Sequence, residues 1–144
     1  MTRIARRLSA SALVLLAMIV LLPQPASAAG NLPCGPDCLA QSLDAVCWEK
    51  EWCAVQIVVK GNVPTSGLVL QYRTADGTAS APGDYVEVPS GELSLTAEGV
   101  NQLRVFVAGD AARERDEMFA VEFVDGEGRT LATSTVTVRD AAGR

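Results

Sequence analysis

A period of two in the hydrophobic pattern, from residue 43 onward, restricts this chain more than any other feature. Apolar side chains at alternate positions indicate β-strands with one buried face. The runs lie at residues 45–48, 54–59, 68–73, 92–95, 102–107, 119–123 and 135–139. Turn residues such as Asp76-Gly77 separate them. Short strands joined by such turns predict an all-β fold, a seven-stranded immunoglobulin-like Greek-key sandwich.

The N-terminal end of the sequence has the pattern of a signal peptide. Three arginines precede an apolar run at residues 11–22, and Ala26-Ser27-Ala28 offers small side chains for cleavage. The run is shorter than the roughly 20 apolar residues that a membrane span needs. We therefore expect cleavage near Ala28 and a secreted or periplasmic mature chain that does not insert into a membrane. The expected organisation is a signal peptide at 1–28, a Cys-containing extension at 29–42 and a sandwich domain at 43–141.

Charge and composition narrow the classes of function. Without the signal peptide the chain keeps nine of its 12 basic residues and all 17 acidic ones, a net charge of −8. This balance argues against nucleic acid and anionic membranes, and it fits a cationic partner such as a metal ion. Histidine is absent, so the usual catalytic triads are excluded. Paired carboxylates remain available for catalysis, but a sandwich this small has little concave volume, and we expect a binding module and no enzyme.

Four cysteines cluster at the start of the mature chain: Cys34, Cys38, Cys47 and Cys53. An exported protein meets an oxidising compartment, so two disulfides are expected. Three pairings are possible, and Cys34–Cys38 with Cys47–Cys53 is favoured because each closes a short loop. Four thiolates also suit zinc, although these spacings match no common zinc pattern. The composition of residues 39–46 is helix-like, and we expect one irregular turn there.

Strand direction brings distant carboxylates to one end of the expected sandwich. If the strands alternate in direction, the turn at 49–51, the segment 74–90 and the loop 109–117 share one end, and the last strand points toward it. The candidate metal ligands at that end are Glu49, Asp84, Asp110, Glu114, Glu117 and Asp140. Glu51 is the alternative to Glu49 after a small change of register. Gathered carboxylates repel and raise one another's pKa unless a cation intervenes, and Ca²⁺ suits such an irregular set of oxygens.

The same residues carry a family resemblance. Residues 72–85 read Tyr-Arg-Thr-Ala-Asp-Gly-Thr-Ala-Ser-Ala-Pro-Gly-Asp-Tyr, which resembles the Calx-β motif of a strand, a Thr-x-Asp-Gly-Thr-Ala turn and Asp-Tyr. The stretch 91–107 resembles the family's hairpin, 110–121 its acidic signature and 135–140 its closing strand. The likeness runs from about Val46 to Asp140. Tyr85, Phe119 and Phe123 are expected to anchor the core.

The resemblance implies a Ca²⁺-binding sandwich like those of sodium–calcium exchangers and extracellular adhesion proteins. The six candidate ligands occupy positions that bind metal in exchanger-like members. The consecutive aspartates of calcium-rich members are missing, because this chain has Gly109-Asp110-Ala111 and Asp140-Ala141-Ala142. We therefore expect about one ion, bound with a dissociation constant on the order of 10⁻⁴–10⁻³ M, as in extracellular modules. The partner would be an unidentified extracellular protein or surface. The alternative is a metal-free interaction or envelope domain.

Overall fold

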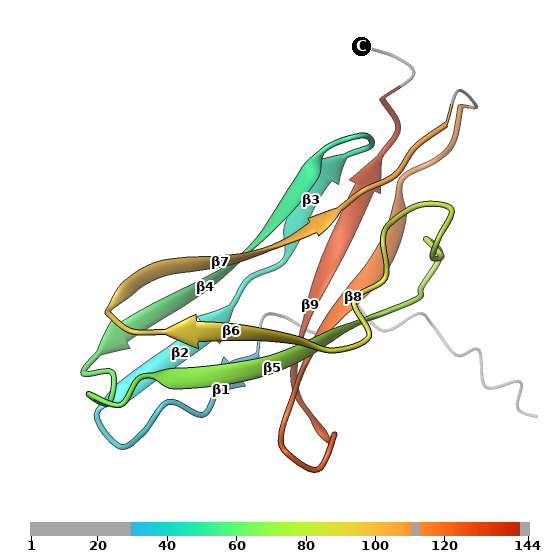
Figure 1. The fold of residues 1–144 in the computed structure, drawn as a ribbon. Helices are drawn as coiled ribbons and strands as arrows, with labels where there is room; N and C mark the ends of the chain where they lie inside the picture. The colour runs from blue at the N-terminus through green and yellow to red at the C-terminus, as the bar shows by residue number, and fades with distance from the viewer. Residues whose placement is uncertain (1–29, 111–112, 142–144) are drawn as a thin grey trace, which may run out of the picture.

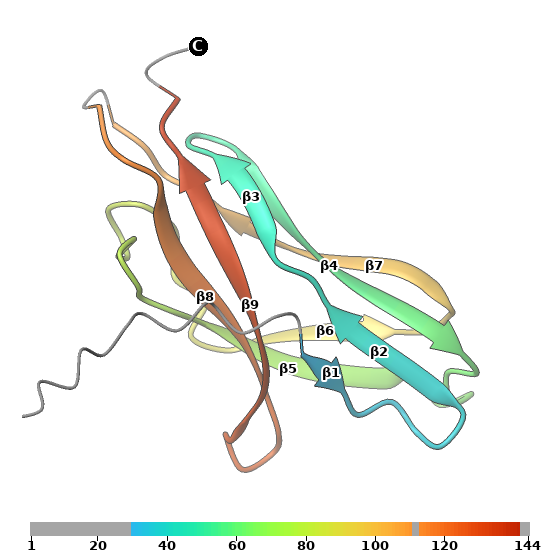
Figure 2. The ribbon, with the colours of Figure 1, turned by 180° about the vertical axis from the view of Figure 1, so that it is seen from behind.

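The computed structural model describes residues 30–110 and 113–141. The expected signal peptide at 1–28 lies outside these residues. Two sheets face each other in a sandwich, as Figures 1 and 2 show from opposite sides. The first sheet has the order β1-β2-β4-β7, made of β1 (Asn31–Leu32), β2 (Cys38–Ser42), β4 (Trp52–Gly61) and β7 (Gly99–Phe106). The second has the order β3-β9-β8-β5-β6, made of β3 (Ala45–Trp48), β9 (Thr130–Arg139), β8 (Glu117–Val124), β5 (Leu68–Ala75) and β6 (Gly91–Leu95).

The all-β sandwich is confirmed, with strands β3 to β9 on the seven expected runs. The strand count is larger than expected, because β1 and β2 bring the described part of the chain to nine strands. The expectation of an irregular turn at 39–46 is wrong. Residues Cys38–Ser42 pair along their whole length with β4, and Ala40 and Ser42 point inward. Strands β1 and β2, which lie in the expected extension at 29–42, thus pair into the first sheet.

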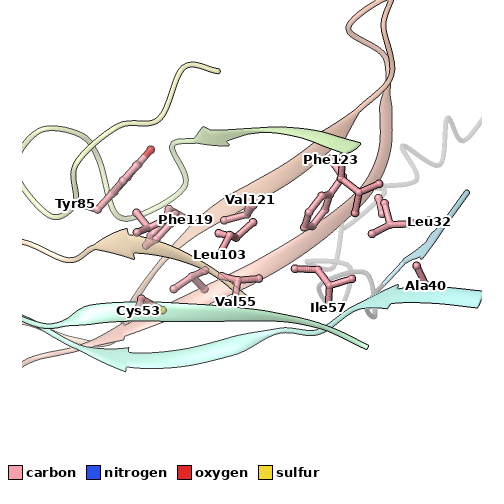
Figure 3. Packing of buried hydrophobic residues seen from close by; sticks show 14 of the residues in the cluster. Leu32, Ala40, Cys53, Val55, Ile57, Tyr85, Leu103, Phe119, Val121 and Phe123 are labelled. Carbon is pink, nitrogen blue, oxygen red and sulfur yellow. The ribbon is translucent and has the colours of Figure 1, made fainter. Parts of the chain in front are cut away.

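The core lies between the sheets and consists of the inward-facing residues of each strand. Figure 3 shows Phe119, Val121 and Phe123 of β8 facing the side of β4 that carries Cys53 and Val55. All five are at most 1% exposed. The expected core anchors are confirmed, because Tyr85 is also 1% exposed and stacks on Phe119. In both sheets every second side chain of a strand points inward, and burial of these apolar side chains packs the two sheets against each other.

The favoured disulfide pairing is confirmed. Cys34–Cys38 closes the turn between β1 and β2, with 5.2 Å between the Cα atoms. Cys47–Cys53 joins β3 to β4 across the turn at 49–51, with 5.4 Å between the Cα atoms. The second bridge ties the two sheets together beside the end where β3 and β9 finish.

Strand directions place specific loops at that end. Strand β3 runs parallel to β9, and the other pairings are antiparallel, so the strands from β3 onward alternate in direction. The turn at 49–51, the loops 76–90 and 107–116 and the end of β9 therefore meet at one pole, seen at the upper end of both ribbon views (Figures 1 and 2). We call this pole the rim. Within the described residues there is no helix long and apolar enough to cross a membrane.

Candidate metal centre

Three of the six predicted ligands form a compact cluster at the rim. Asp84, Glu114 and Glu117 each present one carboxylate oxygen, and these oxygens lie within 4.8 Å of one another. They come from three separate places, the loops 76–90 and 107–116 and the first residue of β8. Asp84 and Glu117 are half-buried and Glu114 is exposed. Residues far apart in sequence thus share one small volume, as the strand directions predicted.

The other three predicted ligands lie at the same rim, where the carboxylates of Glu49 and Asp140 accept hydrogen bonds from backbone amides. The amide of Ala141 donates to Glu49 Oε2 at 3.3 Å, and the amide of Glu114 donates to Asp140 Oδ2 at 3.2 Å. The ammonium of Lys50 donates to the carbonyl oxygen of Asp110. Glu49 is buried at 6% exposure. These groups hold the chain segments that carry the cluster.

Glu49 is buried because glycine stands opposite it. A Cβ atom on Gly109 would lie 2.6 Å from Glu49 Cβ and 2.9 Å from its Oε2, so any larger residue would collide with the carboxylate. The glycine therefore lets the loop 107–116 close over Glu49. This contact links the turn at 49–51 to the acidic loop.

Main-chain hydrogen bonds fix the rim segments to one another. The amide of Glu49 donates to Arg139 at 3.1 Å, and that of Lys50 donates to Val107 at 3.0 Å. The amide of Ala108 donates to the carbonyl of Asp84 at 2.9 Å. Four segments are joined in this way, which limits how far the carboxylates can separate.

Asp84 is oriented by the turn that precedes it. Its Oδ2 accepts hydrogen bonds from the amide of Ser80 at 2.7 Å and from the Ser80 hydroxyl at 3.4 Å. The next residue, Tyr85, stacks on Phe119 with 4.1 Å between ring centroids and an 11° angle between the rings. Phe119 lies two residues after Glu117 on β8, so one aromatic pair sets the spacing between two of the clustered carboxylates.

Burial and like charges both disfavour the ionised forms of the clustered glutamates. Loss of water contacts and then the fields of Asp110 and Asp84 raise the pKa of Glu114 above its ordinary value. Loss of water contacts, then Asp84 and Glu114, raise the pKa of Glu117. Such mutual repulsion is relieved by a cation. The side chains of the cluster offer only oxygen atoms as metal ligands. Histidine is absent from the chain and the cysteines are bonded in pairs, so the residues fit a hard cation such as Ca²⁺.

Several further residues that the sequence pattern did not indicate position the site. Lys50, between the two glutamates of its turn, has a left-handed backbone with φ of 63° and reaches the acidic loop. Thr78 accepts a hydrogen bond from the amide of Met118 at 2.8 Å, which attaches the loop 76–90 to the start of β8. Both contacts join segments that are far apart in the sequence, so no local sequence pattern predicts them.

Asp76 gives the loop 76–90 a dependence on pH. The Tyr85 hydroxyl, 2.6 Å from Asp76 Oδ1, and the amide of Ala81 hold the pKa of Asp76 below its ordinary value of 3.8. A carboxylate whose pKa is lower in the folded state than in the unfolded state stabilises the fold at pH values above its unfolded-state pKa. This stabilisation is lost as the pH falls through the folded-state pKa.

We therefore expect Asp76→Asn to flatten the loss of stability below about pH 4. The slope of unfolding free energy against pH, measured by urea denaturation, checks this. The matched control is Glu92→Gln, which removes an exposed carboxylate on β6 and should leave the slope unchanged. An unchanged slope in Asp76→Asn would show that the hydrogen bond to Tyr85 has no such effect.

The fold and the rim together define the class of this protein: an immunoglobulin-like domain whose loops gather carboxylate oxygens at one pole. The model of the Calx-beta domain family matches residues 46–142, and the chain belongs to this family. The expectation from the sequence motifs is confirmed. No curated protein sequence matches the chain.

Solved structures show the same likeness. The calcium binding domain CBD12 of CALX1.1 is 31% identical, with a TM-score of 0.56 over 67% of this chain and 41% of that chain. The apo form of the Calx CBD1 domain is 30% identical, with a TM-score of 0.54 over 66% of this chain and 88% of that chain. The Calx CBD2 domain, 17% identical with a TM-score of 0.56 over 72% of this chain and 87% of that chain, shares the fold alone. This chain spans less than half the length of the CBD12 structures.

Proposed function

We propose that this chain is an exported Calx-β module that binds one Ca²⁺ ion at its rim. The observation that carries the proposal is the convergence of Asp84, Glu114 and Glu117, whose oxygens lie within 4.8 Å of one another. Family membership supports it, because a similar solved structure is described as a calcium binding domain. Bound calcium would supply the positive charge that lets these carboxylates approach.

The division of roles among the rim residues follows from their contacts. Asp84, Glu114 and Glu117 would hold the ion. Glu49 and Asp140 already accept backbone hydrogen bonds and position the segments around it. Ca²⁺ takes six to eight oxygens in proteins, so three clustered carboxylates leave water and backbone carbonyls to complete one ion's coordination. We therefore propose a weak site, with a dissociation constant on the order of 10⁻⁴–10⁻³ M, like those of other extracellular modules.

Export and a binding role complete the proposal. The signal-like pattern at 1–28 and two disulfides fit an oxidising compartment outside the cytosol. The rim has no His and no thiol for catalysis, and its carboxylates lie at an open loop surface, which supports a binding module over an enzyme. The partner would be an extracellular protein or surface.

We expect Ca²⁺ to stabilise the mature protein against heat. At about 10 mM Ca²⁺, a site in the stated affinity range adds about 1.4 to 2.7 kcal/mol, because only the native state binds the ion. For a domain of this size the melting temperature should rise by about 5–15 °C. Calorimetry of the mature protein with Ca²⁺, and again with a chelator, measures the shift.

Magnesium at equal concentration is the control for ionic strength and should give a much smaller shift, because Mg²⁺ requires tighter octahedral geometry. An identical melting temperature with Ca²⁺ and with chelator would reject the calcium site. The metal-free interaction domain would then be the better account of this fold.

A further inference from the structure

A second candidate site lies at the pole opposite the rim, in an apolar cleft of about 300 Å³. Its walls include Pro33 after β1, Leu68 and Leu70 of β5, Val124 of β8 and Leu131 of β9. Strand directions put these residues at the far end, because β5 begins there and β8 finishes there. Val69 and Leu131 at the cleft are 55% and 40% exposed, so both offer apolar surface to a ligand.

The cleft exists because two neighbouring strands diverge. Strand β8 pairs with β5 only from Gln71↔Val124 to Ala75↔Ala120, so the first three residues of β5 extend past its end. In Figure 1 the turn between β8 and β9 points away from the beginning of β5. The register of β8 against β9 shifts between Phe123 and Val124, which leaves Leu131 as the extra residue of a bulge. Bulges redirect side chains, and this one places Leu131 at the cleft.

Within the part of the chain that the structure describes, no strand pairs with Leu68–Leu70 on the side where β8 has diverged. On its other side β5 pairs with β6, with Leu68 opposite Leu95 and Leu70 opposite Leu93. The amide of Thr74 points toward the β6 side, where it donates to Val88 at 2.9 Å. Backbone groups alternate sides along a strand, so the amide and carbonyl of Val69 face the side that β8 has left. An added strand would find a donor and an acceptor there.

The charged groups at the cleft bind mainly one another. Asp125 is the one charged residue among the described residues that line it. Its carboxylate accepts from Arg129 Nε at 2.7 Å and from the amides of Glu127 and Arg129 at 2.9 Å. Arg129 in turn pairs with Glu127 at 3.1 Å. Asp125, Glu127 and Arg129 together leave a net charge of −1 beside the cleft, so its apolar walls complement neutral groups better than an anion.

We propose that this cleft docks an extended, uncharged segment of a partner protein, which adds as a short strand beside Leu68–Leu70 and inserts one apolar side chain. Three features specify this occupant: the strand edge that β8 has left, apolar walls and charged groups that bind mainly one another. The volume lies at the lower limit of the roughly 300–1,000 Å³ of ligand pockets, which suits a single large side chain. Strand addition of this kind takes affinity from the backbone and specificity from the side-chain pocket.

NMR titration of the isotope-labelled mature protein tests the proposal, with a chelator present so that the rim plays no part. The probes are capped pentapeptides Thr-Val-Xaa-Val-Thr, with Leu, Phe, Ala or Asp at Xaa. The Leu and Phe peptides should shift the amide signals of Val69, Val124 and Leu131. They should bind at least about tenfold more tightly than the Ala and Asp peptides, because they bury more apolar surface. A Leu peptide with every amide N-methylated should lose binding, because it has no N–H to donate.

Variants of the protein provide the matched controls. Leu131→Asp and Val69→Asp change exposed positions and should abolish binding of the Leu peptide, whereas Val100→Asp, at a 66% exposed position on β7, should not. Equal binding of the Leu and Asp peptides, signal changes on another surface, or none at millimolar peptide would overturn the proposal. If a variant unfolds, the peptide series on the unchanged protein still decides. The result is independent of calcium, so it stands apart from the rim proposal.

Discussion

Phe119→Ala should lower the free energy of unfolding by about 3–5 kcal/mol, the usual range for truncating a buried aromatic residue. Phe119 is 1% exposed and stacks on Tyr85 at 4.1 Å. Removing the ring leaves a cavity between the sheets and deletes an aromatic pair worth about 0.5–1.5 kcal/mol beyond its buried area. Urea denaturation of the metal-free mature protein measures the loss. A small domain often has only about 5–15 kcal/mol in total, so this loss is a large fraction of its stability.

The neighbouring residue provides the control. Met118 is 43% exposed on the outer face of β8, and its contacts to the loop 76–90 are made by backbone atoms. Met118→Ala should therefore change stability by less than about 0.5 kcal/mol. Equal losses in Phe119→Ala and Met118→Ala would contradict a core built on alternation along this strand.

Glu117→Gln should affect the calcium-loaded and metal-free proteins in opposite directions. With calcium, the variant should lose the whole gain of about 1.4 to 2.7 kcal/mol expected at about 10 mM Ca²⁺, because it removes a charged ligand from the centre of the cluster. Without metal it should be at least as stable as the parent at neutral pH. Glu117 has a raised pKa, so its ionised form is disfavoured in the native fold, and stability falls as the pH rises through that pKa.

Thermal melting with Ca²⁺ and with chelator separates these two effects. Glu92→Gln removes one exposed charge from β6 and should keep the full calcium response. A Glu117→Gln protein that still gains stability from calcium would show that the ion is bound elsewhere. A variant that loses stability without metal would show that Glu117 has a structural role in the empty rim.

The sequence predicted the rim because the direction of each strand follows from the number of strands that precede it. Each of the seven runs became a strand, so Asp84 in one loop and Asp140 after the last strand arrive at the same pole. The motif at residues 72–85 predicted the family for a related reason: turn and strand residues there recur at fixed spacing. Inward alternation likewise identified Phe119 and Phe123 as core residues, and both are buried.

Other features are tertiary and have no local pattern. Strand β2 was missed because its inward residues, Ala40 and Ser42, are small and give a weak hydrophobic period. It is held by pairing with β4 and by the Cys34–Cys38 bridge. The six acidic candidates were also indistinguishable by sequence. Only the contacts separate three clustered carboxylates from groups such as Glu49, which is buried under Gly109.

The cleft at the far pole illustrates the same limit. Leu131 belongs to a run of ordinary strand residues, and nothing in its sequence context predicts a bulge between β8 and β9. The exposed position follows from a register shift that depends on both strands. A site of this kind can be proposed only once the pairing of β5 with its neighbours is known.

Crystals of the mature protein soaked in about 10 mM Ca²⁺, tenfold above the weakest expected dissociation constant, test the central claim most directly. Anomalous scattering locates the metal independently of any assumption about its ligands. The account predicts one peak, bounded by carboxylate oxygens of Asp84, Glu114 and Glu117. An absent peak in a well-diffracting soaked crystal, or a peak held by other residues, would contradict it.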